Sequence, residues 1–269
     1  MQLTVVVENF CTNRLLKAEW GYCLYLESDK TRLLLDTGSE MHSLMHNMRV
    51  LKIDPSRIDH IVFSHAHFDH TGGLVDAILA APLARRWGSS AMSVQRWSDA
   101  DKKRNGGGGP LFANILTDPF DTWAQITDEV IAFTVPASER DPRFVNSKNM
   151  WEETPDGEKI PDTFKDDVSL LVKGERGASI VLGCAHAGLP NILRYAQKTF
   201  NVGSFDTVLG GTHLSAASAE ELPVWIEALK AFDVKRWRPN HCTGFKAAAA
   251  MAKVFDDVDW AGCGTRIIL

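Results

Sequence analysis

Short apolar runs separated by turn-forming residues recur along the chain. Eight of these runs span five residues each and are rich in β-branched side chains, which favours buried strands over helices. They lie at residues 3–7, 22–26, 32–36, 60–64, 168–172, 179–183, 206–210 and 265–269. The pattern therefore predicts a protein whose core is made mainly of sheets.

Between these runs, apolar residues repeat every three or four positions, which is typical of amphipathic helices. The predicted helices lie at residues 40–51, 71–81, 189–200, 219–232 and 246–255. Ser218 and Glu221 form a capping-box pattern at the start of the fourth helix, where Pro223 is tolerated only near the helix start. Strands dominate the N-terminal third and alternate with helices in the C-terminal third. We therefore expect one domain, residues 1–269, with two sheets and helices outside them.

Residues 85–165 are less regular than the rest of the chain. They contain "GGGG" at 106–109 and the proline-flanked "TPDGEKIPD" at 154–162. Long irregular connections are usually functional or disordered, so we expect an insertion or lid over the scaffold. The glycine run is not a phosphate-binding P-loop, because no G-K-[ST] follows it.

Composition narrows the class of protein. The chain of 269 residues is 45% hydrophobic and 23% charged, as in soluble globular proteins, and its net charge of −5 predicts neither nucleic acid nor an anionic membrane as partner. No apolar run approaches the roughly 18 residues of a membrane span, and the start lacks a signal-peptide pattern. The five cysteines form no C-x-x-C pair and indicate reduced thiols in the cytoplasm. The oligomeric state stays open.

Three of the nine histidines crowd into "SHAHFDH" at residues 64–70. His65 and His67 follow a predicted strand and project to one side of an extended chain, and Asp69 and His70 follow as the chain turns. Imidazole and carboxylate groups are ligands for borderline metals such as zinc, and a bound metal keeps crowded imidazoles neutral. A polar surface loop is the alternative, but four ligand-type residues in six positions favour a metal site.

The sequence "SHAHFDHTGG" resembles the H-x-H-x-D-H signature of the metallo-β-lactamase superfamily, with "LLLDTG" at 33–38 upstream. Further stretches resemble one subgroup, the proteins similar to the methanopterin-pathway enzyme that joins a dihydropterin-methyl diphosphate to a ribofuranosylaminobenzene phosphate. They are "GCAHAGLPNIL" 183–193, "GGTHL" 210–214, "PNHCTG" 239–244 and "VVVEN" near the start. The resemblance implies an α/β (α+β) fold, the αββα sandwich, with the metal site at one sheet edge.

The resemblance also implies which residues hold metal. His65 and His67 correspond to ligands of a first ion, and Asp69 and His70 to ligands of a second. His241 corresponds to the last histidine of the superfamily and completes the second site. Two zinc ions are expected, with manganese or iron as alternatives. Asp36 either orients a ligand histidine or forms a turn before Thr-Gly.

Two departures from the superfamily pattern concern "GCAH". Residues 71–185 contain no histidine, although the superfamily has one there, and Cys184 stands where the bridging acid is expected. We expect His186 to supply the missing ligand of the first ion, since two histidines alone are fewer than the three protein ligands of most catalytic zinc sites. Cys184 is either a thiolate ligand or a buried small residue.

Other residues are predicted around the metals. Asp69 is the residue expected to orient a bridging water, and His213 is an acid, a base, a substrate contact or a packed strand-end histidine. The loop at 185–191 leads into a helix with Pro190 in its first turn, where backbone N–H groups can bind a phosphate oxygen or simply start a helix. Gly188, Asn191 and Gly211 are the predicted substrate-binding residues.

Several functions fit these residues. The first is a binuclear metal-dependent hydrolase that acts on a phosphorylated or ester-like anionic small molecule through a metal-bridging water. The second, implied by the subgroup, is the transferase joining a dihydropterin-methyl diphosphate to an aminobenzene ribose phosphate. A non-catalytic metal-binding module is the third, and the complete ligand set argues against it. A diiron oxidoreductase is disfavoured by His67, where such proteins carry glutamate.

Overall fold

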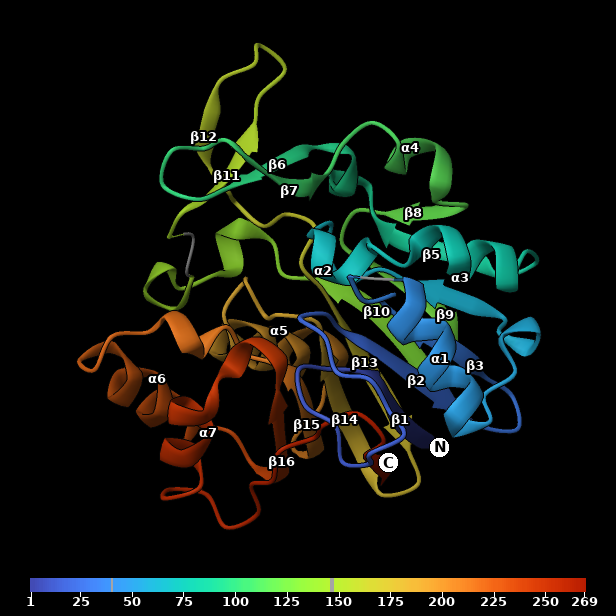
Figure 1. The fold of residues 1–269 in the computed structure, drawn as a ribbon. Coiled ribbons are helices and arrows are strands. Elements are labelled where there is room, and N and C mark those ends of the chain that lie inside the picture. Colours follow the sequence, from blue (N-terminus) through green and yellow to red (C-terminus); the bar gives the residue numbers. More distant parts are fainter. Residues whose placement is uncertain (40, 146–147) are drawn as a thin grey trace.

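The fold is built on two large mixed sheets packed face to face (Figure 1). A computed structural model describes residues 1–39, 41–145 and 148–269. The first sheet has the strand order β17 (Arg266–Ile268), β1 (Gln2–Val7), β2 (Cys23–Glu27), β3 (Arg32–Leu35), β4 (His60–Val62), β5 (Arg85–Ser89) and β8 (Asp118–Phe120). The second has the order β16 (Val234–Asn240), β15 (Phe205–Gly211), β14 (Gly177–Leu182), β13 (Val168–Gly174), β10 (Val130–Thr134) and β9 (Trp123–Thr127).

Helices cover the outer face of each sheet. The first sheet is covered by α1 (Met41–Leu51) and α3 (Leu74–Ala80), and the second by α5 (Leu189–Phe200), α6 (Glu221–Leu229) and α7 (Phe245–Met251). Two one-turn helices, α2 (Phe68–Thr71) and α4 (Phe112–Ile115), complete the set. This arrangement is the αββα sandwich, a mixed α/β fold. None of the described helices combines the length and the apolar character needed to cross a membrane.

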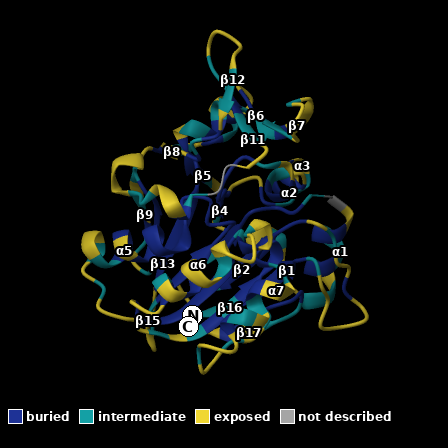
Figure 2. Cartoon of the chain, turned by 90° about the vertical axis from the view of Figure 1, so that its left-hand side faces the viewer, coloured by how far each residue is buried: buried dark blue, intermediate teal, exposed yellow. Residues whose placement is uncertain are grey.

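The strands of the two large sheets consist mostly of buried residues (Figure 2). Their apolar side chains pack between the sheets and beneath the helices. Leu24 and Leu33 of the first sheet and Leu170 and Val181 of the second belong to the central cluster. Alternate residues of the same strands face outward, so Leu34 packs with the helices of the first sheet. The period-two alternation of a strand thus supplies two apolar faces, which explains why the strand runs read as continuously apolar.

The structure confirms most of the predicted elements and adds strands that were not predicted, namely β16 and the strands within residues 85–165. All eight predicted apolar runs overlap strands, and the helices predicted at 40–51 and 189–200 match α1 and α5, although residue 40 lies outside the described residues. The capping box is present, since Glu221 N–H donates to Ser218 Oγ and Ser218 N–H donates to the Glu221 carboxylate. Strand β16 was not among the predicted runs, because its sequence, VKRWRPN, is mostly polar. Its place at a sheet edge tolerates Pro239.

Residues 85–165 are more ordered than their sequence indicates. Strands β5, β8, β9 and β10 of this stretch belong to the two main sheets, whereas β12 (Lys159–Pro161), β11 (Met150–Glu153), β6 (Gln95–Ser98) and β7 (Arg104–Gly108) form a third sheet. The strands of the third sheet are short and polar, so they lack the apolar signal of a core strand. Figure 1 shows the third sheet at one end of the sandwich, above α2.

The glycine run at 106–109 lets the third sheet approach the histidine-rich loop. Gly107 forms an isolated bridge with His67, and a Cβ atom on Gly107 would lie 2.0 Å from the Ala66 carbonyl oxygen. Its φ of +112° also disfavours any other residue. Strand β7 can therefore lie directly on the loop only because this position is glycine.

Candidate metal centre

The predicted ligands converge because they all follow strands at one edge of the sandwich. Strands β3 and β4 are parallel neighbours in the first sheet, and β14, β15 and β16 are parallel neighbours in the second. Ligands of α/β proteins bind beyond the carboxyl ends of such strands. The residues that follow these ends are Asp36 after β3, His65 to His70 after β4, Cys184 and His186 after β14, His213 after β15, and His241 after β16.

Two groups of side chains match the two predicted sites. The donor atoms of His65, His67 and His186 lie within 4.8 Å of one another, and so do those of Asp69, His70 and His241. The three imidazole rings of the first group have centroids 4.6–4.9 Å apart. In the second group, Asp69 Oδ2 lies 3.4 Å from His241 Nε2 and 3.8 Å from His70 Nε2.

Hydrogen bonds fix the orientation of three of these imidazoles. His70 Nδ1 donates to Asp36 Oδ2 at 2.7 Å, so Asp36 lies where the orienting carboxylate was predicted. Ser64 Oγ donates to the same oxygen and accepts from His65 Nδ1 at 2.9 Å. His241 Nδ1 lies 3.1 Å from Asn9 Oδ1 and donates to it. In each ring a hydrogen bond holds Nδ1, and this orientation directs Nε2 toward the centre of the site.

The site fits a metal because it leaves buried nitrogens without partners. Among the described residues, His65 Nε2, His241 Nε2 and both ring nitrogens of His186 are buried and make no hydrogen bond. Such groups cost free energy unless something satisfies them, and a bound cation would do so. Nitrogen, carboxylate and thiol donors together suit zinc or another borderline metal.

The protonation states of the histidines also favour a bound metal. Burial lowers the pKa of His65 and His186 well below the usual value, and burial lowers the pKa of His67 to about 4. Burial also opposes charge on His70, but Asp36 and Asp69 raise the pKa of His70 to about 9. At neutral pH His65, His67 and His186 are therefore uncharged and can bind a metal without releasing a proton. His70 is protonated, so a metal that binds there must displace its proton.

Strained backbone surrounds the site. Asp36, Ala185, His213 and His241 all have φ between +48° and +62°, the left-handed region that residues with a Cβ rarely adopt. Residues of this kind cluster at functional sites, because the surrounding structure must hold them in place. Each of the four lies one to three residues beyond a strand end. No sequence pattern predicts this left-handed conformation.

The site forms part of the floor of an open pocket of about 360 Å³. Its lining includes metal-site residues, the aromatic residues Trp20 and Phe68, and residues of the third sheet and its loops, among them Ser98, Asp99, Arg104, Gly106 and Met150. Trp20 is 58% exposed and its ring centroid lies 5.6 Å from that of His241. Sequence reasoning missed these lining residues, because they carry no motif.

The remaining predicted residues have the following places. His213 is half-buried in the pocket, with its ring 4.4 Å from that of His186. Asn191 is buried, and its amide bonds to backbone of Asp141 and Ala187. Gly211 N–H donates to the Gly183 carbonyl. Gly188 N–H donates to Ala185 O. These bonds give the last three a structural role, and substrate contact by them stays a prediction.

Two consecutive aspartates hold the loops of the first group, and sequence reasoning did not single them out. Asp166 Oδ2 accepts from Ala66 N–H, between His65 and His67, at 2.9 Å. Asp167 Oδ2 accepts from Ala187 N–H, directly after His186, at 2.8 Å. The pair precedes β13, where acidic residues ordinarily signal only a turn.

The fold and the site define a known class of protein. The chain belongs to the metallo-beta-lactamase superfamily, whose family model matches residues 21–199. It is 30% identical, over 88% of its length and 84% of the relative, to the 7,8-dihydropterin-6-methyl-4-(beta-D-ribofuranosyl)-aminobenzene-5'-phosphate synthase of Methanocaldococcus jannaschii. It is 25% identical to an uncharacterized protein of the same organism, over 94% of each chain.

Among solved structures, the chain is similar to Tm1679, a metal-dependent hydrolase of the beta-lactamase superfamily. The TM-score is 0.84 at 24% identity, with 100% of this chain and 99% of the other covered. This likeness supports the fold and confirms the αββα architecture expected from the signature residues.

We expect His186→Ala to lose one metal. His186 is 2% exposed, and both of its ring nitrogens are buried without a hydrogen-bond partner. The affinity of that group for zinc should fall by more than the ~10–100-fold that loss of an outer-sphere partner costs. Competition with a chromophoric chelator measures it. His46→Ala, on the outer helix α1, is the control. Full affinity at both sites in His186→Ala, with one site lost in Cys184→Ala, would show that the sulfur is the ligand instead.

Proposed function

We propose that the protein is a metal-dependent hydrolase acting on a phosphorylated or ester-like small molecule. The observation that carries this proposal is the convergence of two donor groups in an open pocket. Two zinc ions bound there would ionise a water near neutral pH and polarise the scissile bond. The His65, His67 and His186 group would hold the first ion, and the Asp69, His70 and His241 group the second.

The chain's own side chains supply positioning and proton transfer. Asp69 is 8% exposed and lies in the pocket lining, so its carboxylate is placed to orient an attacking water and accept its proton. His213 faces the pocket from the end of β15, and its Nδ1 makes no hydrogen bond. Burial lowers the pKa of His213 to about 4, so the neutral ring acts as a base or a hydrogen-bond partner of substrate.

The pocket also supports an anionic substrate. Arg104 lines it, and its guanidinium carbon lies 5.3 Å from the Phe68 ring centroid. Within the described residues Arg104 has no carboxylate partner within ion-pair distance, so its charge is available to a ligand. Trp20 and Phe68 offer apolar surface in the same pocket, which suits a substrate with a ring and an acidic group.

A transferase is the second candidate. The 30% identity to the dihydropterin synthase covers most of both chains and supports it. In that case the same residues would bind a diphosphate and ionise it as a leaving group while an aromatic acceptor attacks in place of water. The pocket lining admits either reaction, since both begin with an anionic ligand at the metals.

One experiment separates the two candidates. Zinc-loaded protein is supplied with phosphodiesters, lactones, thioesters and dihydropterin diphosphates in isotopically labelled water. A hydrolase releases product that carries the label without any added acceptor. A transferase turns over only with the aminobenzene ribose phosphate acceptor, and its joined product carries no label. No turnover of any of these would contradict both candidates.

We expect two metal ions per chain at saturation. Asp69 belongs only to the second group, so Asp69→Ala should retain one ion and wild type two. Elemental analysis after equilibration with excess zinc and gel filtration counts them, with Asp29→Ala in the exposed β2–β3 turn as control. Chelation should abolish activity, and zinc should restore it. One ion in both wild type and Asp69→Ala would remove the binuclear arrangement.

A further inference from the structure

Two thiols, not one, lie at the metal centre. The donor atoms of Cys184, His241 and Cys242 lie within 4.8 Å of one another, and so do those of His65, His70 and Cys184. Cys184 therefore belongs to both sides of the centre, and Cys242 adds a second sulfur on the side of His241. Both cysteines are buried, at 3% and 4% exposed, and both line the pocket.

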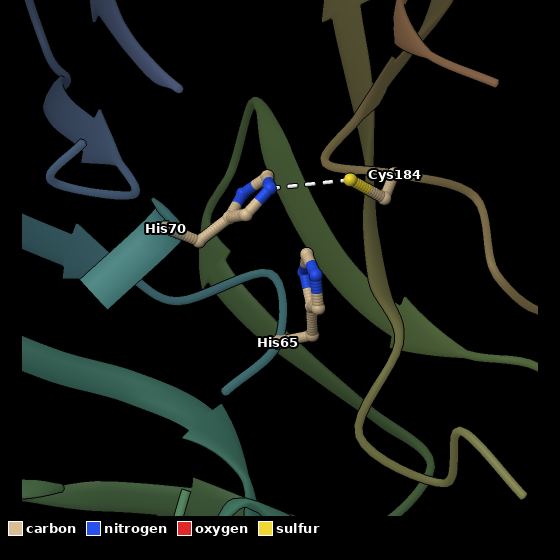
Figure 3. A group of neighbouring side chains, drawn as sticks. All are labelled: His65, His70 and Cys184. Carbon is tan, nitrogen blue, oxygen red and sulfur yellow. Dashed lines mark hydrogen bonds between the residues drawn. The ribbon is translucent and has the colours of Figure 1, made fainter. Parts of the chain in front are cut away.

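The Cys184 sulfur faces the free nitrogen of His70. The two atoms lie 3.1 Å apart, as the dashed line in Figure 3 shows. His70 Nδ1 is hydrogen-bonded to Asp36, so Nε2 is the ring nitrogen that can bind a metal together with the Cys184 sulfur. In Figure 3 the His65 ring points toward the same space, which makes this space common to two nitrogens and one sulfur.

The Cys242 sulfur fits where it does because Gly211, which lies against it, has no side chain. A Cβ atom on Gly211 would lie 2.6 Å from Cys242 Sγ, so any larger residue there would displace the sulfur. His213 N–H donates to Cys242 Sγ at 3.3 Å. An N–H donor directed at sulfur stabilises negative charge on it, as in other sites where thiolates bind metal. A packed core thiol needs neither feature.

We propose that Cys242 is a metal ligand beside His241 and that, together with Cys184, it makes the second metal position a mixed nitrogen–sulfur site. The proposal rests on the metal centre of the proposed function and specifies its donors. Thiolates are soft ligands and favour zinc and other borderline metals over magnesium, calcium or manganese. The expected resident metal is therefore zinc, and manganese should bind the second position poorly.

Cobalt substitution tests the proposal without an activity assay. Protein stripped of metal under reducing, oxygen-free conditions is titrated with Co²⁺. Visible ligand-field bands report any bound cobalt, whereas a near-ultraviolet charge-transfer band appears only when thiolate sulfur is a ligand. We expect wild type to show both. Cys184→Ser and Cys242→Ser should each weaken the charge-transfer band, and the double variant should lose it. Cys11→Ser, an exposed cysteine outside the donor groups, is the control and should keep it.

The outcomes separate this inference from the proposed function. Ligand-field bands with a charge-transfer band that Cys242→Ser leaves unchanged would overturn the role of Cys242 while keeping the metal centre. Absence of ligand-field bands would overturn the metal centre itself. Zinc X-ray absorption on Cys184→Ser holoprotein does not use the Cys242 variant, so it remains decisive if Cys242→Ser does not fold. It should still detect a sulfur neighbour of zinc, which only Cys242 can supply, and no sulfur there would refute the proposal.

Discussion

Asp69→Asn is expected to lower kcat by about 10²–10⁴-fold, the usual contribution of a side chain positioned for proton transfer. The two side chains have the same shape, so the buried position accepts the change. Burial raises the pKa of the Asp69 carboxyl, but His70 and His241 outweigh this and hold the pKa well below its usual range. Asp69 is therefore fully ionised at neutral pH, and asparagine removes that charge and its capacity to accept a proton.

The measurement is turnover of the best substrate found in the panel, with zinc-replete protein and circular dichroism to confirm the fold. Asp29→Asn is the matched control, since it makes the same chemical change in the exposed β2–β3 turn. Turnover near the wild-type value in Asp69→Asn, with both metals still bound, would remove Asp69 from the reaction. A loss confined to metal content would instead limit Asp69 to metal binding.

The site could be predicted from sequence wherever the donors are close along the chain. His65 to His70 lie within one loop after a strand, so their spacing alone predicts convergence. His186 and His241 could be placed only through the family resemblance, because strand order brings β14 and β16 to the same edge as β4. The role of Asp36 could not be decided from the sequence, because an aspartate that forms a turn before Thr-Gly and one that bonds to His70 look identical there.

What sequence reasoning missed depends on contacts between distant segments. Cys242 follows a ligand and reads as a packing residue until Gly211, on another strand, is seen to make room for its sulfur. Asp166 and Asp167 act through backbone N–H groups, which leave no mark on the sequence of the loops that they hold. The third sheet was not predicted, because its strands pack on a loop rather than in the core and therefore need no alternation of apolar and polar residues.

A buried charge network centred on Arg96 connects the third sheet to the metal loop, the histidine-rich residues 64–70. This side chain, 1% exposed on β6, lies 2.7 Å from Asp166 and 3.3 Å from Asp162. Asp166 in turn accepts the Ala66 N–H, which lies between His65 and His67. Burial raises the pKa of Asp162 to about 7, although Arg96 lowers it. One cation thus offsets two buried carboxylates.

We expect Arg96→Met to lower the free energy of unfolding by about 3–5 kcal/mol, because it leaves buried charge without a partner. Urea denaturation of the apo protein at pH 7 measures the loss. Arg85→Met, which breaks the exposed pair with Asp118, is the control and should change stability little. Zinc affinity should fall as well, since Asp166 loses the partner that holds it against the metal loop.

The pH dependence of this loss has a definite sign. An acid whose pKa is higher in the folded state than in the unfolded state binds its proton more readily when folded, so its ionisation costs stability as pH rises. Without Arg96 the pKa of Asp162 should rise above about 7, so this carboxyl is protonated and uncharged at the lower end of the pH range. The destabilisation in Arg96→Met should therefore be largest near pH 8 and shrink toward pH 5. A deficit that is constant across this range, or one that Asp162→Asn fails to relieve in the double variant, would mean that Arg96 acts through its packing rather than its charge.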